Sequence, residues 1–351
     1  IFYINLPFGL VALLLANHYL PNSRFKQAIH RVDWIGILLL AVGIGALQIM
    51  LERGEHEQWF DSHEIQALAA ITVFSLVAFV WHELRTAHPV VDFSPLRDAQ
   101  FSASIVFSFL LGMALFGTIF YLPLYLQSLL NYNAWETGLV ILPGAISSGI
   151  TMAVMGKTLT RLNIDLRWIA ILGVAIFGVS MYQHQAFTTE SGHADFFWPL
   201  IWRGVGLGML FVPLNALAMA RIAPEQIAGA TGLYTLIRQL GGSVGIAAAA
   251  TQFSHLQATF KADISLSVSE LSQTTRDYEF MMQQLLTSKG VTHADLPEAM
   301  YRLLDAQMTA QASMIAFEHL FSQFSLALVF ALPLLLLMPT AKNLERFGGD
   351  H

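Results

Sequence analysis

The sequence predicts an all-α membrane protein, a polytopic bundle of nine membrane-spanning helices. Of its 351 residues, 55% are hydrophobic and only 12% are charged, which is too apolar for an ordinary water-soluble domain. The apolar runs are about 18 to 25 residues long, the length that an α-helix needs to cross a bilayer core. They do not alternate with a period of two, so a transmembrane β-barrel is not predicted.

Nine stretches qualify as spans and give the expected order of helices. Their approximate limits are residues 2–20, 34–51, 65–83, 101–127, 137–156, 168–186, 197–220, 229–252 and 317–338. The chain opens inside the first of these runs, with neither an initiator Met nor a basic segment ahead of Ile1. We therefore expect a further part of the protein upstream of Ile1.

Positive charge in the connections predicts the orientation of the bundle. Short cytoplasmic loops are enriched in Lys and Arg. One alternating set of connections holds eleven such residues, whereas the other set of short connections holds only Arg53. This bias places the C-terminus in the cytoplasm and the start of the first span outside.

The longest connection, residues 253–316, is predicted to lie outside the membrane. An apolar face at helical spacing follows Asp295 and Pro297 and predicts a helix; it consists of Met300, Leu303, Leu304 and Met308. A second apolar surface predicts a helical hairpin; it consists of Leu271, Phe280, Met281, Leu285 and Leu286. Two interpretations stay open, a cap on the outer face of the bundle and a docking surface for a periplasmic partner.

Two arginines within spans are the main candidates for a site in the membrane. An ionised side chain is costly in hydrocarbon and normally faces a protein interior or a watery cavity. Arg238 lies about ten residues into its span, a depth that favours a buried ion pair or a cavity. Arg203 lies about six residues from the outer end of its span, where snorkelling to the interface and a cavity role both stay open. The polar residues that would complete a cavity are Asn215, Tyr234, Gln239, Tyr121, Tyr125 and Gln127.

Glycines cluster beside both arginines, and we interpret them as helix-packing positions. Small residues let neighbouring helices approach closely. The glycines concerned are Gly204, Gly206, Gly208, Gly241, Gly242 and Gly245. The first three are not a dinucleotide-binding fingerprint, because that motif needs a preceding strand.

The remaining residues argue against an enzyme, a metal site or a nucleic-acid partner. The chain has no Cys, hence no thiolate metal site and no Cys nucleophile, and it has neither an HExxH motif nor a spaced Ser/His/Asp set. His184 and His193 share a predicted outer loop with Glu190 and Asp195, which we interpret as a solvated loop. The net charge of -6 comes without a basic stripe, so nucleic acid is not an expected partner.

Several motifs in order resemble one transporter family. Residues 1–9 (IFYINLPFG) resemble the FxINxPxG signature of the fourteen-span drug:proton antiporters of the major facilitator superfamily. Residues 31–36 (RVDWIG) and 47–54 (LQIMLERG) are similar to the first of its two extra central helices. Residues 203–208, 211–214, 232–233 and 238–245 resemble its C-terminal half. The long outer loop before the last helix is most similar to the EmrB branch of this EmrB/QacA type.

The resemblance implies a major facilitator fold and divides the chain into three parts. Residues 1–20 correspond to the last helix of an N-terminal half, residues 21–100 to two linker helices, and residues 101–351 to the C-terminal six-helix half with its loop 253–316. The resemblance also identifies Gly156, Lys157 and Arg161 with the cytoplasmic gating loop. In that loop Thr160 and Asn163 replace the Asp and Gly that the family often has.

The resemblance also implies a function. It implies a bacterial inner-membrane transporter that exports amphipathic or lipophilic drugs in exchange for protons by alternating access, with a proton gradient in place of a cofactor. The implied partners are the lipid bilayer, the drugs, a periplasmic membrane-fusion adaptor and an outer-membrane channel. In this scheme Arg238 serves the cavity or an ion pair with the other half, and Arg203 serves the outer gate.

Proton coupling usually needs a titratable carboxylate inside the membrane. Glu83, Glu136 and Glu318 each lie near a span end, so we expect the proton-carrying group upstream of Ile1. Two alternatives to drug export stay open, a major facilitator transporter of a single metabolite and a non-transporting membrane scaffold.

Overall fold

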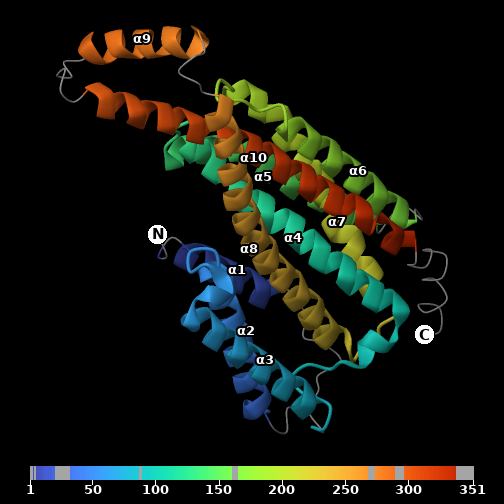
Figure 1. Cartoon of the computed structure of the whole chain (residues 1–351). Coiled ribbons are helices and arrows are strands. Elements are labelled where there is room, and N and C mark those ends of the chain that lie inside the picture. Colours follow the sequence, from blue (N-terminus) through green and yellow to red (C-terminus); the bar gives the residue numbers. More distant parts are fainter. Residues whose placement is uncertain are drawn as a thin grey trace.

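The computed structural model describes residues 3, 5–19, 32–86, 89–159, 165–267, 273–288 and 296–336, and these residues form a helical bundle (Figure 1). The helices are α1 (Asn5–Tyr19), α2 (Trp34–Arg53), α3 (His63–Glu83), α4 (Ala99–Ser128), α5 (Ala134–Leu159), α6 (Leu166–His184), α7 (His193–Met219), α8 (Ile227–Ser267), α9 (Gln273–Ser288) and α10 (Leu296–Leu336). Two short 3₁₀ turns, η2 (Trp59–Asp61) and η3 (Ser94–Arg97), precede α3 and α4. No strand occurs in the described ranges, and the predicted all-α class is confirmed.

Seven of the described helices are long and apolar enough to cross a membrane, namely α2 to α7 and α10. The nine predicted spans include two more. The first, α1, covers only 15 residues in the structure, and the other, α8, carries Arg238, Gln239 and Ser243 among its glycines, which lowers its apolar character. It nevertheless packs along the spanning helix α4 (Figure 1) and so belongs to the same bundle.

Three of the spanning helices begin at an aspartate that caps the first turn. The side chains of Asp33, Asp98 and Asp165 accept hydrogen bonds from backbone N–H groups two or three residues further on, at 2.9 to 3.1 Å. Each bond satisfies a donor that the helix itself leaves free. These caps fix where α2, α4 and α6 start, on the side predicted to be cytoplasmic.

Helices α4 to α8 and α10 share one core. The central helix α7 packs against both α5 and α6, α8 packs along α4, and α10 contacts α4, α6 and α8. Phe107, Leu111, Phe177, Leu210 and Phe321 are buried in this core. Because lipid is as apolar as these side chains, close packing rather than burial from water holds the helices together.

Helices α2 and α3 form an antiparallel pair that contacts the rest of the bundle through α8. The Ser243 hydroxyl donates to Gln48 Oε1 at 2.6 Å, and Trp59 Nε1 donates to Thr251 Oγ1 at 2.9 Å. Many apolar side chains of the pair are exposed, as expected for helices that face lipid. The division of the chain at residues 20 and 100 stays a prediction.

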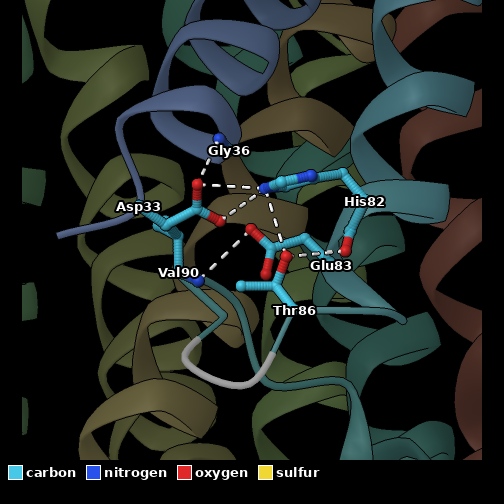
Figure 2. A network of polar contacts seen from close by, with 6 residues as sticks. All are labelled: Asp33, Gly36, His82, Glu83, Thr86 and Val90. Carbon is cyan, nitrogen blue, oxygen red and sulfur yellow. Dashed lines mark hydrogen bonds and ion pairs between the residues drawn. The ribbon is translucent and has the colours of Figure 1, made fainter. Parts of the chain in front are cut away.

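A polar network joins the start of α2 to the end of α3 (Figure 2). His82 Nε2 lies 3.0 and 2.9 Å from the two carboxylate oxygens of Asp33. The Thr86 hydroxyl donates to the carbonyl of His82 at 2.9 Å, and the Val90 N–H donates to Glu83 Oε1 at 3.2 Å. Glu83, which the sequence places at a span end, is only 4% exposed.

The segment predicted to lie outside the membrane is built from extensions of two bundle helices. Each of α8 and α10 has 41 residues, or about 62 Å, against about 30 Å for a bilayer core. Their extensions pair through Lys261 and Asp305 at 2.7 Å and through a 2.6 Å hydrogen bond from Gln257 to Ser313. Neither Gly nor Pro interrupts residues 253–267 or 298–316, so the helices continue instead of ending at the predicted limits of their spans.

The predicted apolar faces of this segment lie on α9 and α10, which contact each other (Figure 1). The helix predicted around Met300 to Met308 is confirmed as the first part of α10. On α9, Leu286 is buried whereas Phe280 and Met281 are exposed. Leu271 and the side chain of Leu285 lie outside the described part of the segment.

Candidate functional site

Arg238 lies on α8 near the middle of the bundle and faces two aromatic rings. Its guanidinium carbon is 4.8 Å from the centroid of the Phe211 ring on α7 and 5.7 Å from that of Tyr234, one turn earlier on α8. Both distances are in the range of cation–π attraction. The Arg238 side chain is half-buried, and among the described residues no carboxylate forms an ion pair with it.

Glycines bring the α8 backbone close to α4 at this point. A Cβ atom on Gly112 of α4 would collide with the backbone carbonyl of Arg238. Cβ atoms on Gly241 and Gly245 would also collide with the backbone of α4, and one on Gly242 would collide with the side chain of Phe116. The absence of these side chains lets the two helices approach closely, and the guanidinium of Arg238 extends toward α7.

Two other predicted cavity residues lie in the same region. Tyr234 is buried in a small core with Phe101 and Leu233. Asn215 lies one turn after Phe211 on α7 and donates its side-chain N–H to the Phe211 carbonyl at 2.8 Å. The structure therefore gathers Arg238 and Tyr234 of α8 with Phe211 and Asn215 of α7, and we refer to these four residues as the Arg238 site.

The two tyrosines of α4 do not join the Arg238 site. Tyr121 and Tyr125 are buried, and their rings lie 6.0 and 5.5 Å from the ring of Phe317 on α10. The Tyr125 hydroxyl donates at 2.9 Å to a backbone carbonyl in the loop after α6. Tyr121 lies about 13.5 Å further along α4 than Gly112, so both tyrosines belong to another part of the core, toward the side predicted to be outer.

Arg203 is also distant from Arg238, because it precedes Phe211 by about 12 Å along α7. Its side chain is only 6% exposed, and its Nη1 has no hydrogen-bond partner in the described part of the chain. The guanidinium therefore lies inside the helix bundle, and it does not snorkel to the interface.

The prediction that His184 belongs to a solvated loop is wrong. The helix α6 continues through this residue, which is 1% exposed and packs its ring 5.2 Å from that of Phe321. Its Nδ1 lies 2.7 Å from the Ser180 carbonyl. Since a carbonyl only accepts, Nδ1 carries the proton of this hydrogen bond.

The glycines of α7 lie at close contacts with neighbouring helices. Cβ atoms on Gly204 and Gly208 would collide with α5, and one on Gly206 would collide with α6. The gating loop is described only in part. Gly156 and Lys157 lie near the end of α5, whereas Arg161, Thr160 and Asn163 lie outside the described residues.

Reasoning from sequence missed Phe211 as a partner of Arg238. Its spacing, four residues before Asn215 in the same span, was the available signal, because such residues share a helix face. The burial of Glu83 was also not predicted, because hydropathy does not distinguish a buried from an exposed glutamate at the end of a span.

Comparison with known proteins identifies the family. The model of the Major Facilitator Superfamily matches residues 1–246. The chain belongs to this superfamily. It is 28% identical to the fatty acid resistance protein FarB of Neisseria gonorrhoeae, over 100% of this chain and 67% of FarB. It is 27% identical to the multidrug export protein EmrB of Haemophilus influenzae, over 100% of this chain and 66% of that relative. The EmrB of Escherichia coli K12 is 31% identical, over 76% of this chain and 52% of that relative.

The chain therefore spans about two thirds of the length of the first two relatives and about half of the third. The predicted EmrB-like family and major facilitator fold are confirmed. A member of this transporter superfamily is not an enzyme. Its apolar helices and its relatives make it a multi-pass protein of a bacterial inner membrane.

Proposed function

We propose that this chain works in a proton-coupled antiporter that exports amphipathic compounds by alternating access. The observation that carries the proposal is Arg238, a cation in mid-bundle held against two aromatic rings without a carboxylate partner among the described residues. Charged residues at membrane depth are normally paired, or they mark a transport pathway. The relatives named for multidrug export and for fatty acid resistance support this interpretation.

The chemistry of the Arg238 site suits an amphipathic ligand. The guanidinium offers charge-assisted hydrogen bonds to an anionic or carbonyl group, while the rings of Phe211 and Tyr234 offer apolar contact. In the same scheme Arg203, buried toward the predicted outer side, stabilises the outer gate. The C-terminus is placed in the cytoplasm by the distribution of Lys and Arg in the short loops.

Everted vesicles that carry the full-length protein test the proposal. The probes are an anionic amphipathic dye, a long-chain fatty acid and a small hydrophilic metabolite, each tested with a proton gradient and after a protonophore has collapsed it. We expect gradient-dependent accumulation of the amphipathic probes and none of the metabolite. Uptake of the metabolite alone favours the single-metabolite transporter, and the absence of gradient-dependent flux favours the scaffold.

We further propose that the extensions of α8 and α10, together with α9, dock a periplasmic membrane-fusion adaptor and through it an outer-membrane channel. The exposed apolar side chains of Phe280 and Met281 on α9 support this role. Replacement of residues 265–310 by a short linker is expected to abolish cross-linking to the adaptor while vesicle transport persists. Cross-linking that survives the replacement identifies the segment as a cap.

A further inference from the structure

The end of the α2–α3 pair where α2 begins and α3 ends holds two carboxyl groups close together (Figure 2). The point where Gly36 lacks a Cβ atom lies 2.7 Å from Asp33 Oδ2 and 2.8 Å from Glu83 Oε1. The two oxygens are therefore no farther apart than the sum of those distances. In Figure 2 the Glu83 carboxyl lies beside the Asp33 carboxylate, and a dashed line joins it to the backbone nitrogen of Val90.

The two carboxyl groups have different partners. Asp33 accepts a hydrogen bond from the Gly36 N–H at 2.9 Å and lies against His82 Nε2. The Gly36 N–H, aided by His82, holds the pKa of Asp33 below its usual value. Glu83 accepts the Val90 N–H through Oε1, but its Oε2 is buried with no hydrogen-bond partner among the described residues.

Two ionised carboxylates in this position would repel each other. Among the described residues, the charged groups that act on Glu83 are Asp33 on α2 and His82 on α3, and the segment after α3 contributes the backbone N–H groups of Val90 and Val91. His82 is already engaged with Asp33. A proton held between the carboxyl groups removes the repulsion and creates a charge-assisted hydrogen bond.

We propose that Glu83 and Asp33 form a proton-binding site, in which Glu83 keeps its proton and donates it to the Asp33 carboxylate. The other two carboxylates near span ends do not offer this chemistry. Glu136 and Asn133 cap each other's backbone N–H groups at 2.9 Å at the start of α5. Glu318 is exposed on α10.

The proton-binding site also anchors the segment that leads to the Arg238 site. Val91 and Phe93, which follow Val90, pack against the small core that contains Tyr234. Phe93 also meets the ring of Phe79 on α3 at 6.3 Å. The protonation state of Glu83 therefore affects the segment after α3, which packs against the small core around Tyr234. This segment connects the α2–α3 pair to the six-helix core.

Infrared difference spectroscopy of the purified protein in detergent tests the inference without measuring transport. At neutral pH, the difference between the wild type and Glu83→Gln is expected to contain the carbonyl band of one protonated carboxylic acid. Glu52→Gln, which changes an exposed glutamate of α2, serves as the matched control and should leave that band unchanged. The proposal is overturned if the wild-type spectrum contains no carboxylic acid band that disappears in Glu83→Gln.

A second variant keeps the test decisive if Glu83→Gln folds poorly. Asp33→Asn replaces the proposed acceptor, so the band must shift or weaken; a band that stays in place with equal intensity contradicts the shared proton.

Hydrogen exchange supplies an independent readout. The Val90 amide should stay protected in Glu83→Gln, whose side-chain oxygen still accepts, and should lose at least tenfold of its protection in Glu83→Ala. Equal protection in both variants overturns the anchoring role.

Discussion

The guanidinium carbon of Arg238 lies 4.8 Å from the ring centroid of Phe211, and this contact joins α8 to α7 near the centre of the bundle. Phe211→Leu removes a cation–π attraction worth about 0.5–2 kcal/mol but keeps an apolar side chain of similar size. We expect the KM for an amphipathic substrate to rise about 2- to 30-fold, with little change in Phe211→Tyr. Equal KM values in the two variants would show that the ring contact plays no part.

Close contact between α4 and α8 makes Gly112 intolerant of a side chain. Gly112→Ala places a Cβ atom against the carbonyl of Arg238, and such overpacking costs about 1–3 kcal/mol. Gly149→Ala on α5 is the matched control, because no described atom lies within 4 Å of its Cβ position. Thermal unfolding in detergent, followed by tryptophan fluorescence, should show a lower midpoint for the first variant only. Equal midpoints contradict the packing described for α4 and α8.

Asp33 predicts a dependence of stability on pH. Because its pKa is lowered in the folded protein, its contribution is fully present above the unfolded value of about 3.9 and is lost as the pH falls through the lower folded value. Acidification from pH 5 to about pH 3 should therefore lower the unfolding midpoint more steeply in the wild type than in Asp33→Asn. If the unfolding midpoints of the two proteins fall equally with pH, Gly36 and His82 do not stabilise the ionised form of Asp33 in the folded protein.

We expect the protein to fold without the positive charge of Arg203. Its buried Nη1 has no hydrogen-bond partner among the described residues, and a buried cation without a partner is costly. Arg203→Met fills much of the same space without the charge, so its unfolding midpoint should equal or exceed that of the wild type. Arg203→Ala, which leaves a cavity, should lose about 2–5 kcal/mol. An equal loss in both variants would mean that the guanidinium itself stabilises the fold.

Helix order could be predicted from the sequence because length and apolarity are properties of the chain alone. The predicted spans 34–51 and 65–83 lie within α2 and α3, and an aspartate cap marks the start of α2. The helix around Met300 to Met308 was predicted, but its continuity with the last span in α10 and the extension of α8 past residue 252 were not, because a helix that leaves the bilayer loses its apolar signal without losing its hydrogen bonds.

It was harder to predict which neighbouring helix each side chain faces than to predict its position along a span. A membrane helix is apolar on the lipid side and on the protein side, so the 3.6-residue periodicity that marks a buried face in soluble helices is weak. Arg238 and Tyr234 were correctly placed together because they lie one turn apart on one helix. Tyr121 and Tyr125 were grouped with them by depth and polarity, although the structure packs both against Phe317 of α10, away from Arg238.

The measurement that tests the central claim most directly is proton-driven uptake of an amphipathic dye into everted vesicles containing the full-length protein with Arg238→Ala, at expression equal to that of the wild type. Arg238→Lys, which keeps the charge, and Gly149→Ala, at a position with open space, serve as controls. We expect uptake to fall at least tenfold in Arg238→Ala, to persist in part in Arg238→Lys and to remain unchanged in Gly149→Ala. Uptake by Arg238→Ala at the wild-type rate would contradict the assignment of the Arg238 site to transport.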